Sequence, residues 1–162
     1  MLIVAEGAKI SHWADIEDSV RGTKIIIEDG VQIDSFVKIK SVGGSGDLRI
    51  GANSLINSGV VIYTGNGIQI GRDVLIAANC TLAPVNHEYV SKKKKIKEQR
   101  FMASKNGIVI EDDVWIGANS VILDGAIIRK GAVIGANSLV RGELEAYGVY
   151  VGSPVKLIRR RM

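Results

Sequence analysis

The chain has 162 residues, enough for one domain with a core of its own, and we expect no domain boundary. The net charge of +4, from 21 basic and 17 acidic side chains, suits an anionic ligand, but it is too small and too evenly spread to indicate a nucleic-acid-binding protein. The single cysteine, Cys80, excludes an internal disulfide, and the first ten residues have no basic flank and no sustained apolar run. We therefore expect a cytoplasmic protein without a signal peptide or transmembrane segment.

From Val4 onward the sequence repeats a unit of six residues that begins with an aliphatic side chain. The leading residues of these units are Val4, Ile10, Ile16, Ile27, Ile33, Ile50, Ile56, Ile62, Ile70, Ile76, Leu82, Ile110, Ile116, Ile122, Ile128, Ile134 and Val140. The fifth position is small or β-branched, as in Ala14, Val20, Val31, Ser54, Val60, Val74, Cys80, Val114, Ser120, Ala126, Ala132 and Ser138. The motif IGANS, at 50–54, 116–120 and 134–138, is the sharpest form of the unit.

A period of six excludes an amphipathic helix, in which apolar residues recur at three and four. Short strands joined by tight turns explain it, with the leading residue pointing inward and Gly, Asn and Asp in the turns. One unit cannot bury its own apolar side, so the units must stack into a solenoid. Insertions such as 41–47 are then loops at one edge, and the glycine-rich stretches 43–46 and 65–71 are turns, because neither opens a helix or contains the Lys of a phosphate-binding loop.

The repeat breaks once, after Leu82, where APVNHEY is followed by VSKKKKIKEQR. His87 lies at this break, and a histidine side chain can accept a proton from an alcohol near neutral pH. A rigid edge beneath a long loop is a common place for a functional residue. The second histidine, His12, is expected on the surface.

These repeats resemble the hexapeptide-repeat acyltransferases, and the resemblance covers nearly the whole chain. It implies an all-β fold, a left-handed parallel β-helix of triangular section with a protruding loop and a short C-terminal helix. The single domain 1–162 then divides into N-terminal coils over 1–87, an active-site loop over 88–107, C-terminal coils over 108–152 and a basic helix or tail over 153–162. From NHEY to VGSPVKLIRRR, the second half is most similar to the branch that O-acetylates sugars in bacterial surface polysaccharides, together with the galactoside and maltose acetyltransferases.

The resemblance implies that His87 is the general base and that the acceptor hydroxyl attacks acetyl-CoA directly, without a metal. It places Asn57 at the acceptor sugar and Trp115 between the acceptor and the coenzyme arm, although Asn57 could equally form a turn. Asn86 could contact the acceptor, orient His87 or form a turn. By the same resemblance the backbone N–H of Ala118 meets the oxyanion and that of Ala136 the pantetheine arm. Basic residues at the coenzyme's phosphates would be Lys130, Arg141, Arg159 and Arg160.

Two functions remain open within this family. The first is acetyl-CoA-dependent O-acetylation of a sugar in lipopolysaccharide or capsule synthesis, by a homotrimer with its active sites between subunits. The second is N-acetylation of a nucleotide-linked amino sugar. A carbonic anhydrase of the same fold is disfavoured because two histidines cannot supply a three-histidine zinc site. An ice-binding or purely structural role is disfavoured because the threonines form no ladder.

Overall fold

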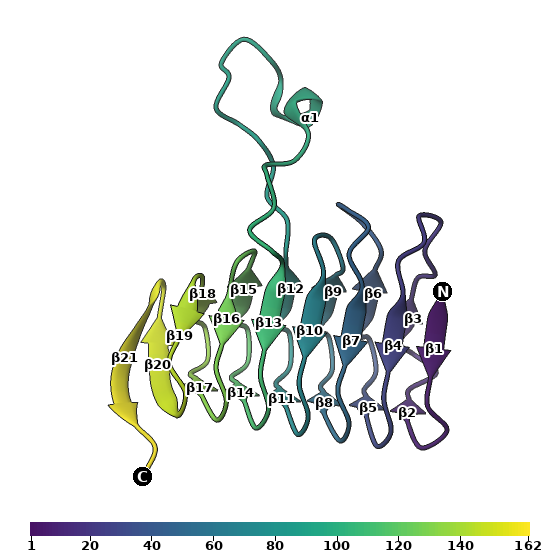
Figure 1. Cartoon of the computed structure of the whole chain (residues 1–162), viewed down its shortest axis with the longest axis vertical. Coiled ribbons are helices and arrows are strands. Elements are labelled where there is room, and N and C mark those ends of the chain that lie inside the picture. The colour runs from purple at the N-terminus through teal and green to yellow at the C-terminus, as the bar shows by residue number, and fades with distance from the viewer.

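The computed structural model describes all 162 residues and shows a parallel β-helix with three sheets (Figure 1). The first sheet contains β1 (Leu2–Val4), β4 (Ile25–Ile27), β7 (Leu48–Ile50), β10 (Ile68–Ile70), β13 (Ile108–Ile110), β16 (Ile127–Ile128) and β19 (Glu143–Leu144). The second contains β2 (Lys9–Ile10), β5 (Gln32–Ile33), β8 (Leu55–Ile56), β11 (Leu75–Ile76), β14 (Trp115–Ile116), β17 (Val133–Ile134), β20 (Gly148–Gly152) and β21 (Val155–Arg160). The third contains β3 (Asp15–Ile16), β6 (Lys38–Lys40), β9 (Val61–Tyr63), β12 (Thr81–Ala83), β15 (Val121–Leu123) and β18 (Leu139–Val140).

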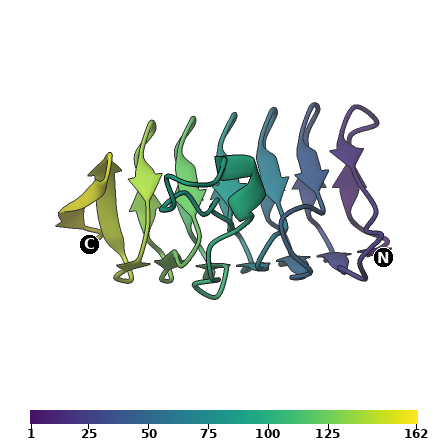
Figure 2. The same ribbon diagram turned by 90° about the horizontal axis from the view of Figure 1, so that it is seen from above.

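Each coil passes through the three sheets in turn, and the coils stack along one axis (Figure 2). We call the turn from the first to the second sheet the first corner, the turn from the second to the third sheet the second corner, and the turn back to the first sheet the third corner. The stacked strands pair in parallel without a shift, so that Ile50 lies beside Ile70 and Ile70 beside Ile110. Every corner therefore lines up with the same corner of the next coil.

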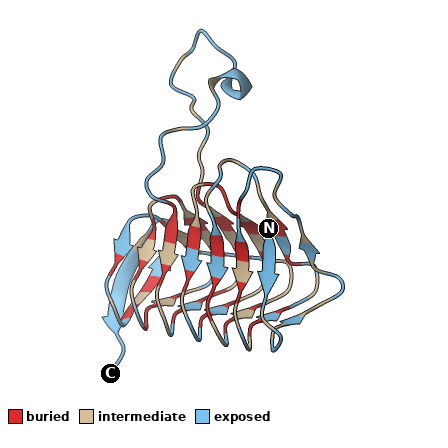
Figure 3. Ribbon diagram, turned by 45° about the vertical axis from the view of Figure 1, so that its right-hand side comes forward, coloured by how far each residue is buried: buried red, intermediate tan, exposed pale blue.

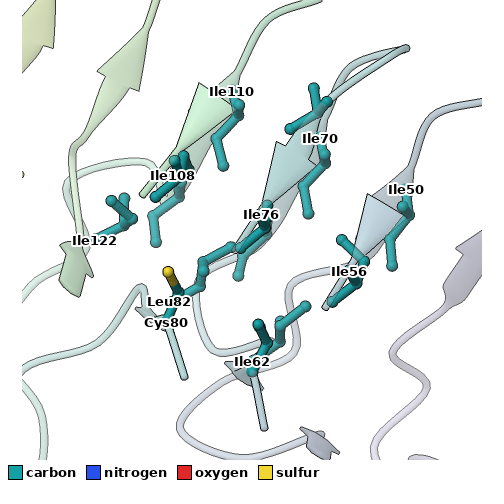
Figure 4. Close-up of a cluster of buried hydrophobic side chains, with 14 of the residues drawn as sticks. Ile50, Ile56, Ile62, Ile70, Ile76, Cys80, Leu82, Ile108, Ile110 and Ile122 are labelled. Atoms are coloured by element: carbon teal, nitrogen blue, oxygen red, sulfur yellow. The ribbon is translucent and has the colours of Figure 1, made fainter. Parts of the chain in front are cut away.

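The leading residues of the hexapeptides form the core, as the repeat predicts. Ile50, Ile56 and Ile62 come from the three sheets of one coil and point toward one another inside it (Figure 4). They belong to a single cluster of 29 buried hydrophobic residues. The first coil is the exception, because no coil covers it, and Val4 remains 42% exposed. Val20, at a fifth position of the repeat, is 99% exposed because it lies in the turn between β3 and β4.

The recurrent Asn of the IGANS motif has a conformational role. Asn53, Asn119 and Asn137 adopt φ angles of 61°, 58° and 57°, in the left-handed region. Asn and Gly occupy this region more readily than other residues, so their placement turns the chain at the corner. This confirms that asparagines of this motif serve as turn residues.

The C-terminal segment is not a helix, and this part of the sequence prediction is wrong. Residues after Pro154 form β21, which pairs antiparallel with β20 across five residue pairs. The last coil leaves the backbone groups of β20 without a neighbouring coil, and β21 covers this edge. The four-residue helix α1 (Ile96–Gln99), in the loop, is too short to cross a membrane.

The protruding loop expected after His87 is present between β12 and β13. It leaves the third corner between β12 and β13 and projects away from the coils (Figure 1). Most of its residues are exposed, whereas the buried residues lie in the coils beneath it (Figure 3). The insertion therefore adds a structure outside the solenoid without interrupting the stacking of β10 on β13.

One buried polar group in the core allows a test of how an unpaired hydroxyl affects stability. The hydroxyl of Thr64 is fully buried and has no hydrogen-bond partner. We predict that Thr64→Val, which keeps the shape and removes the unpaired hydroxyl, increases the free energy of unfolding by about 1 kcal/mol in urea denaturation.

Thr81→Val, in the partly exposed strand β12, serves as the control and should change the free energy of unfolding by less than about 0.5 kcal/mol. Destabilisation by Thr64→Val would contradict the prediction and would mean that its hydroxyl has a partner.

Candidate functional site

The two arms of the loop pair with each other at the third corner. The N–H of Glu88 donates to the carbonyl of Arg100 at 3.0 Å, and the N–H of Met102 donates to the carbonyl of Asn86 at 2.8 Å. His87 and Phe101 form the antiparallel bridge between these bonds. His87 therefore lies in a paired segment of backbone at the base of the loop.

The contacts of His87 determine which ring nitrogen is free. Its Nδ1 lies 3.2 Å from the carbonyl oxygen of Arg100, and its ring packs beside Phe101 with the ring centroids 4.9 Å apart. A carbonyl oxygen can only accept, so Nδ1 must carry the hydrogen, and Nε2 keeps its lone pair. Because the side chain is exposed, Nε2 can accept a proton from a bound ligand.

The carbonyl that orients His87 belongs to a residue with an unusual backbone. Arg100 has φ 63° and ψ −135°, a conformation that costs on the order of 1–3 kcal/mol for a residue other than glycine. Arg100 immediately follows α1 and accepts bonds from both His87 and Glu88. The surrounding loop must hold this conformation, and the orientation of His87 depends on it.

The outer part of the loop is braced by one side chain. The Gln99 side-chain amide accepts from the N–H of Ser91 at 3.0 Å and donates to the carbonyls of Ser91 and Lys94 at 2.9 and 3.0 Å. These three bonds tie α1 to the outgoing arm. They fix the segment just before Arg100.

A buried carboxylate anchors the returning arm. Asp124, only 6% exposed, accepts from the backbone N–H groups of Lys105 and Gly107 at 2.9 and 3.0 Å and from the amide of Asn66 at 3.4 Å. Charge-assisted bonds of this kind are stronger than neutral ones. Asp124 thus joins three successive turns at the third corner, and it fixes where the loop re-enters the solenoid.

His87 separates two hollows on the third corner. The first, of about 430 Å³, leads toward the C-terminal coils and is lined by Asn86, His87, Tyr89, Met102, Lys105, Leu123, Asp124 and Arg141. The second, of about 370 Å³, faces the N-terminal coils and is lined by Val42, Gly43, Tyr63, Ala83, Val85, His87 and Phe101. We call them the C-terminal hollow and the N-terminal hollow.

Ala118 and Ala136 occupy the second corner of successive coils, away from His87. Neither backbone N–H has a hydrogen-bond partner within the chain. At the first corner, by contrast, the corresponding N–H of Ala52 donates to Glu28 and that of Lys130 to Glu111. The second corner therefore presents two free N–H donors on successive coils, whereas two of the equivalent groups at the first corner are capped by glutamates.

Asn57 also lies at the second corner, and its side-chain amide donates to the carbonyl of Ile76 at 3.0 Å. It lines a hollow of about 640 Å³ on the second sheet of the first three coils. Its predicted contact with the acceptor cannot be made beside His87 of the same chain. Asn86 lies beside His87 and forms no side-chain hydrogen bond; the orienting role falls to the carbonyl of Arg100.

Trp115 is 51% exposed on the second sheet, between Leu75 and Val133 of the neighbouring strands. It lines a hollow of about 280 Å³ together with Asp113 and Arg161. The structure therefore places Trp115 on a different face from His87.

The predicted phosphate-binding residues do not gather at one place. Arg141 lies in the C-terminal hollow with His87, whereas Lys130 lies at the first corner. Arg159 and Arg160 lie on β21, and Arg160 forms an ion pair with Glu145. Of the four, only Arg141 shares a hollow with the histidine.

Among the side chains with shifted pKa values, Glu111 and Cys80 show two different structural causes. The hydrogen bond from Arg129, followed by that from the N–H of Lys130, lowers the pKa of Glu111 at the first corner. Arg129 also contacts Glu143, so it links three coils. Burial raises the pKa of Cys80, whose thiol donates to the carbonyl of Gly117, and this side chain is part of the core. No three His, Cys, Asp or Glu side chains gather where they could hold a metal ion.

The groups that position His87 cannot be identified from the sequence alone. Arg100 acts through a carbonyl that any residue would provide, so its identity carries no signal. Asp124 precedes Gly125, and the pair reads as an ordinary turn. The prediction that charge is evenly spread is also wrong. Residues 88–107 contain seven basic and two acidic side chains, a net charge of +5, whereas the whole chain has +4 and the other 142 residues therefore have −1.

Comparison with known proteins agrees with this fold. Residues 107–142 match the family model described as bacterial transferase hexapeptide (six repeats), and residues 47–84 match the hexapeptide repeat of succinyl-transferase. The crystal structure of a point mutant of AntD, an N-acyltransferase from Bacillus cereus, in complex with dTDP and coenzyme A, superimposes with a TM-score of 0.82 and 25% identity over 98% of this chain and 84% of that one. The left-handed parallel β-helix expected from the sequence is confirmed.

Two curated relatives share more of the sequence. A protein of Escherichia coli K12 named as a putative lipopolysaccharide biosynthesis O-acetyl transferase, WbbJ, is 33% identical over 81% of this chain and 66% of its own length. The galactoside O-acetyltransferase of the same organism is 34% identical over 70% of this chain and 54% of its own. The chain thus spans between about half and two thirds of these relatives. It belongs to the hexapeptide-repeat acyltransferase family.

The geometry at His87 makes a prediction that needs no substrate. We predict that the neutral imidazole of His87 is the Nδ1–H tautomer, because the Arg100 carbonyl can only accept. Two-bond ¹H–¹⁵N correlation spectra above the titration range of histidine check this directly. With only His12 and His87 in the chain, His87→Ala assigns both sets of signals.

Arg100→Gly keeps the carbonyl and relieves the positive φ, so it should leave the tautomer of His87 unchanged. A dominant Nε2–H tautomer in the wild-type protein would contradict this description of the site.

Proposed function

We propose that this chain transfers an acetyl group from acetyl-CoA to a sugar hydroxyl, in the synthesis of a bacterial surface polysaccharide in the cytoplasm. The observation that carries the proposal is His87, with Nδ1 held by the Arg100 carbonyl and Nε2 free at the junction of two hollows. The likeness to WbbJ and to galactoside O-acetyltransferase supports an acetyl donor and a sugar acceptor.

The chemistry needs one base and no covalent enzyme intermediate. Nε2 of His87 takes the proton of the acceptor hydroxyl as its oxygen attacks the thioester carbonyl carbon. The C–O bond forms and gives a tetrahedral oxyanion, which collapses with cleavage of the C–S bond. The imidazolium then returns the proton to the departing CoA sulfur, so that His87 ends in its starting state. The Arg100 carbonyl stabilises the imidazolium through the Nδ1–H bond.

The donor can extend from His87 along the C-terminal hollow. His87 follows β12, and Arg141 follows β18, two coils further along the same corner. At the usual spacing of paired strands this is a rise of about 10 Å. The pantetheine arm would lie along this rise, with the phosphates near Arg141. The net charge of +5 on residues 88–107 would attract the same anionic molecule.

The free N–H groups of the second corner supply the complementary half of the site. Ala118 would donate to the oxyanion, and Ala136, one coil further on, to the pantetheine arm. Since these donors and His87 lie on different corners of one chain, they can meet only between two copies. This separation supports a homotrimer, in which His87 of one subunit faces the second corner of the next. Asn57 and Trp115 would also reach the ligands from the neighbouring subunit.

N-acetylation of a nucleotide-linked amino sugar is the second candidate. AntD is an N-acyltransferase whose structures contain dTDP or dTDP-4-amino-4,6-dideoxyglucose together with coenzyme A, and both of these complexes superimpose over 98% of this chain. The same base can accept a proton from an amine that attacks the thioester. Paired acceptors that differ only in hydroxyl against amine separate the two functions.

The first test combines binding and turnover. We predict that acetyl-CoA binds in calorimetry with one site per chain, both in the wild type and in His87→Ala. Transfer to a panel of sugars, followed by release of the CoA thiol, should fall about 10²- to 10⁴-fold in His87→Ala, because general-base catalysis contributes a factor of this size. His12→Ala is the matched control and should retain activity.

An absence of acetyl-CoA binding to the wild-type protein would overturn the proposed activity. Full turnover in His87→Ala would overturn only the role proposed for His87, and not the proposed activity.

The second test concerns Arg141. Arg141→Gln should raise the KM for acetyl-CoA about tenfold, with a smaller change in kcat, because it removes a charge-assisted contact to phosphate. Arg72→Gln, an exposed arginine at the first corner, should leave the KM unchanged. Equal effects of the two substitutions would show that only the overall charge matters.

A further inference from the structure

The two hollows beside His87 differ in charge. The C-terminal hollow contains Arg141, Lys105 and the carboxylate of Asp124. The Asp124 oxygens are occupied by the N–H groups of Lys105 and Gly107 and by the amide of Asn66, and neither cation forms an ion pair, so the two positive charges remain available to an anion. No charged residue other than His87 itself, in its protonated form, lines the N-terminal hollow. If the proposed function holds, CoA with its phosphates belongs to the C-terminal side, and the acceptor reaches Nε2 from the N-terminal side.

The walls of the N-terminal hollow are almost entirely apolar. Val42, Val85 and Phe101 face it together with Ala83, and the hydroxyl of Tyr63 is the one polar side-chain group there besides the imidazole. Val42 and Phe101 are 41% and 46% exposed, so apolar surface is left open at this point. A hollow of about 370 Å³ lies within the usual range for a small-molecule site.

The position of Val85 is fixed by two glycines. A Cβ atom at Gly65 would lie 2.5 Å from Cγ1 of Val85, and one at Gly43 would lie 2.9 Å from it. Both glycines have positive φ, 41° and 83°. The glycine-rich turns 43–46 and 65–71 thus make room for this valine. They shape the floor of the hollow rather than bind phosphate.

We infer that the acceptor is a 6-deoxyhexose whose methyl-bearing edge packs on Val42, Val85 and Phe101. The inference rests on the proposed function and names its acceptor class. A sugar hydroxyl that is buried without a partner loses its bonds to water, and these walls offer too few groups to replace them. A methyl group at the same position buries apolar surface and loses no hydrogen bond. Tyr63 is left to pair with one of the remaining hydroxyls.

Matched acceptor pairs test the inference. The probes are methyl α-L-rhamnopyranoside against methyl α-L-mannopyranoside, and methyl β-D-fucopyranoside against methyl β-D-galactopyranoside. The members of each pair differ only in methyl against hydroxymethyl. With acetyl-CoA saturating, we expect kcat/KM to favour the deoxy member of at least one pair about ten- to hundredfold.

Two variants locate the preference in this hollow. Val85→Thr keeps the shape and adds a hydroxyl, and should reduce the preference for the deoxysugar at least threefold while calorimetric binding of acetyl-CoA is unchanged. Tyr63→Phe should raise the KM of the deoxysugar with little change in kcat, and it provides a second reading if Val85→Thr does not fold. Val20→Thr, almost fully exposed in the first turn of the solenoid, is the control.

Equal use of both members in each pair, preference for the hydroxymethyl sugars, or no transfer to either deoxysugar would overturn the inference. An unchanged preference in Val85→Thr together with an unchanged KM of the deoxysugar in Tyr63→Phe would overturn the assignment to this hollow. These outcomes differ from a failure of the proposed function, which appears as an absence of acetyl-CoA binding.

Discussion

The fold depends on the parallel ladder that joins each coil to the next without a shift in register. Three short strands per coil must return the chain to the point where Ile70 lies on Ile50 and Ile110 on Ile70. Since each coil closes in this way, one aliphatic side chain from each sheet meets the others inside it (Figure 4). The same condition aligns the corners into three columns along the axis. Residues that are 18 or more apart in the sequence therefore become neighbours on one edge.

The three columns of corners have different roles. At the first corner, carboxylates cap backbone N–H groups in some coils, as Glu28 does for Ala52 and Glu111 for Lys130. The second corner leaves its N–H groups free at Ala118 and Ala136. The third corner tolerates insertions, and the long loop there positions His87 through the carbonyl of Arg100. A rigid solenoid that carries His87 on one corner and free N–H groups on another suits a site that is completed by a second copy of the same chain.

The sequence predicts the structure best at positions that have the same role in every coil. The aliphatic positions, the left-handed Asn of the IGANS motif and the presence of a protruding loop follow from period and turn chemistry, and the structure confirms them. The C-terminal strand was mistaken for a helix because VKLIRR has no fixed period of its own. Its conformation is set by the free edge of β20, which exists only after the coils have stacked. The orientation of His87 was equally inaccessible, since it depends on a backbone carbonyl thirteen residues away and on the φ angle that Arg100 adopts.

The central claim is that His87 and the free N–H groups of the second corner act together across two copies of the chain. Mixing subunits of two inactive variants tests it most directly: His87→Ala removes the base, and Ala136→Trp fills the second corner. After joint unfolding and refolding, the mixture should regain acetyltransferase activity, because some interfaces combine an intact His87 with an intact second corner. Mixed assemblies that form but remain inactive would contradict the account, since the two groups would then belong to the same copy or to unrelated sites.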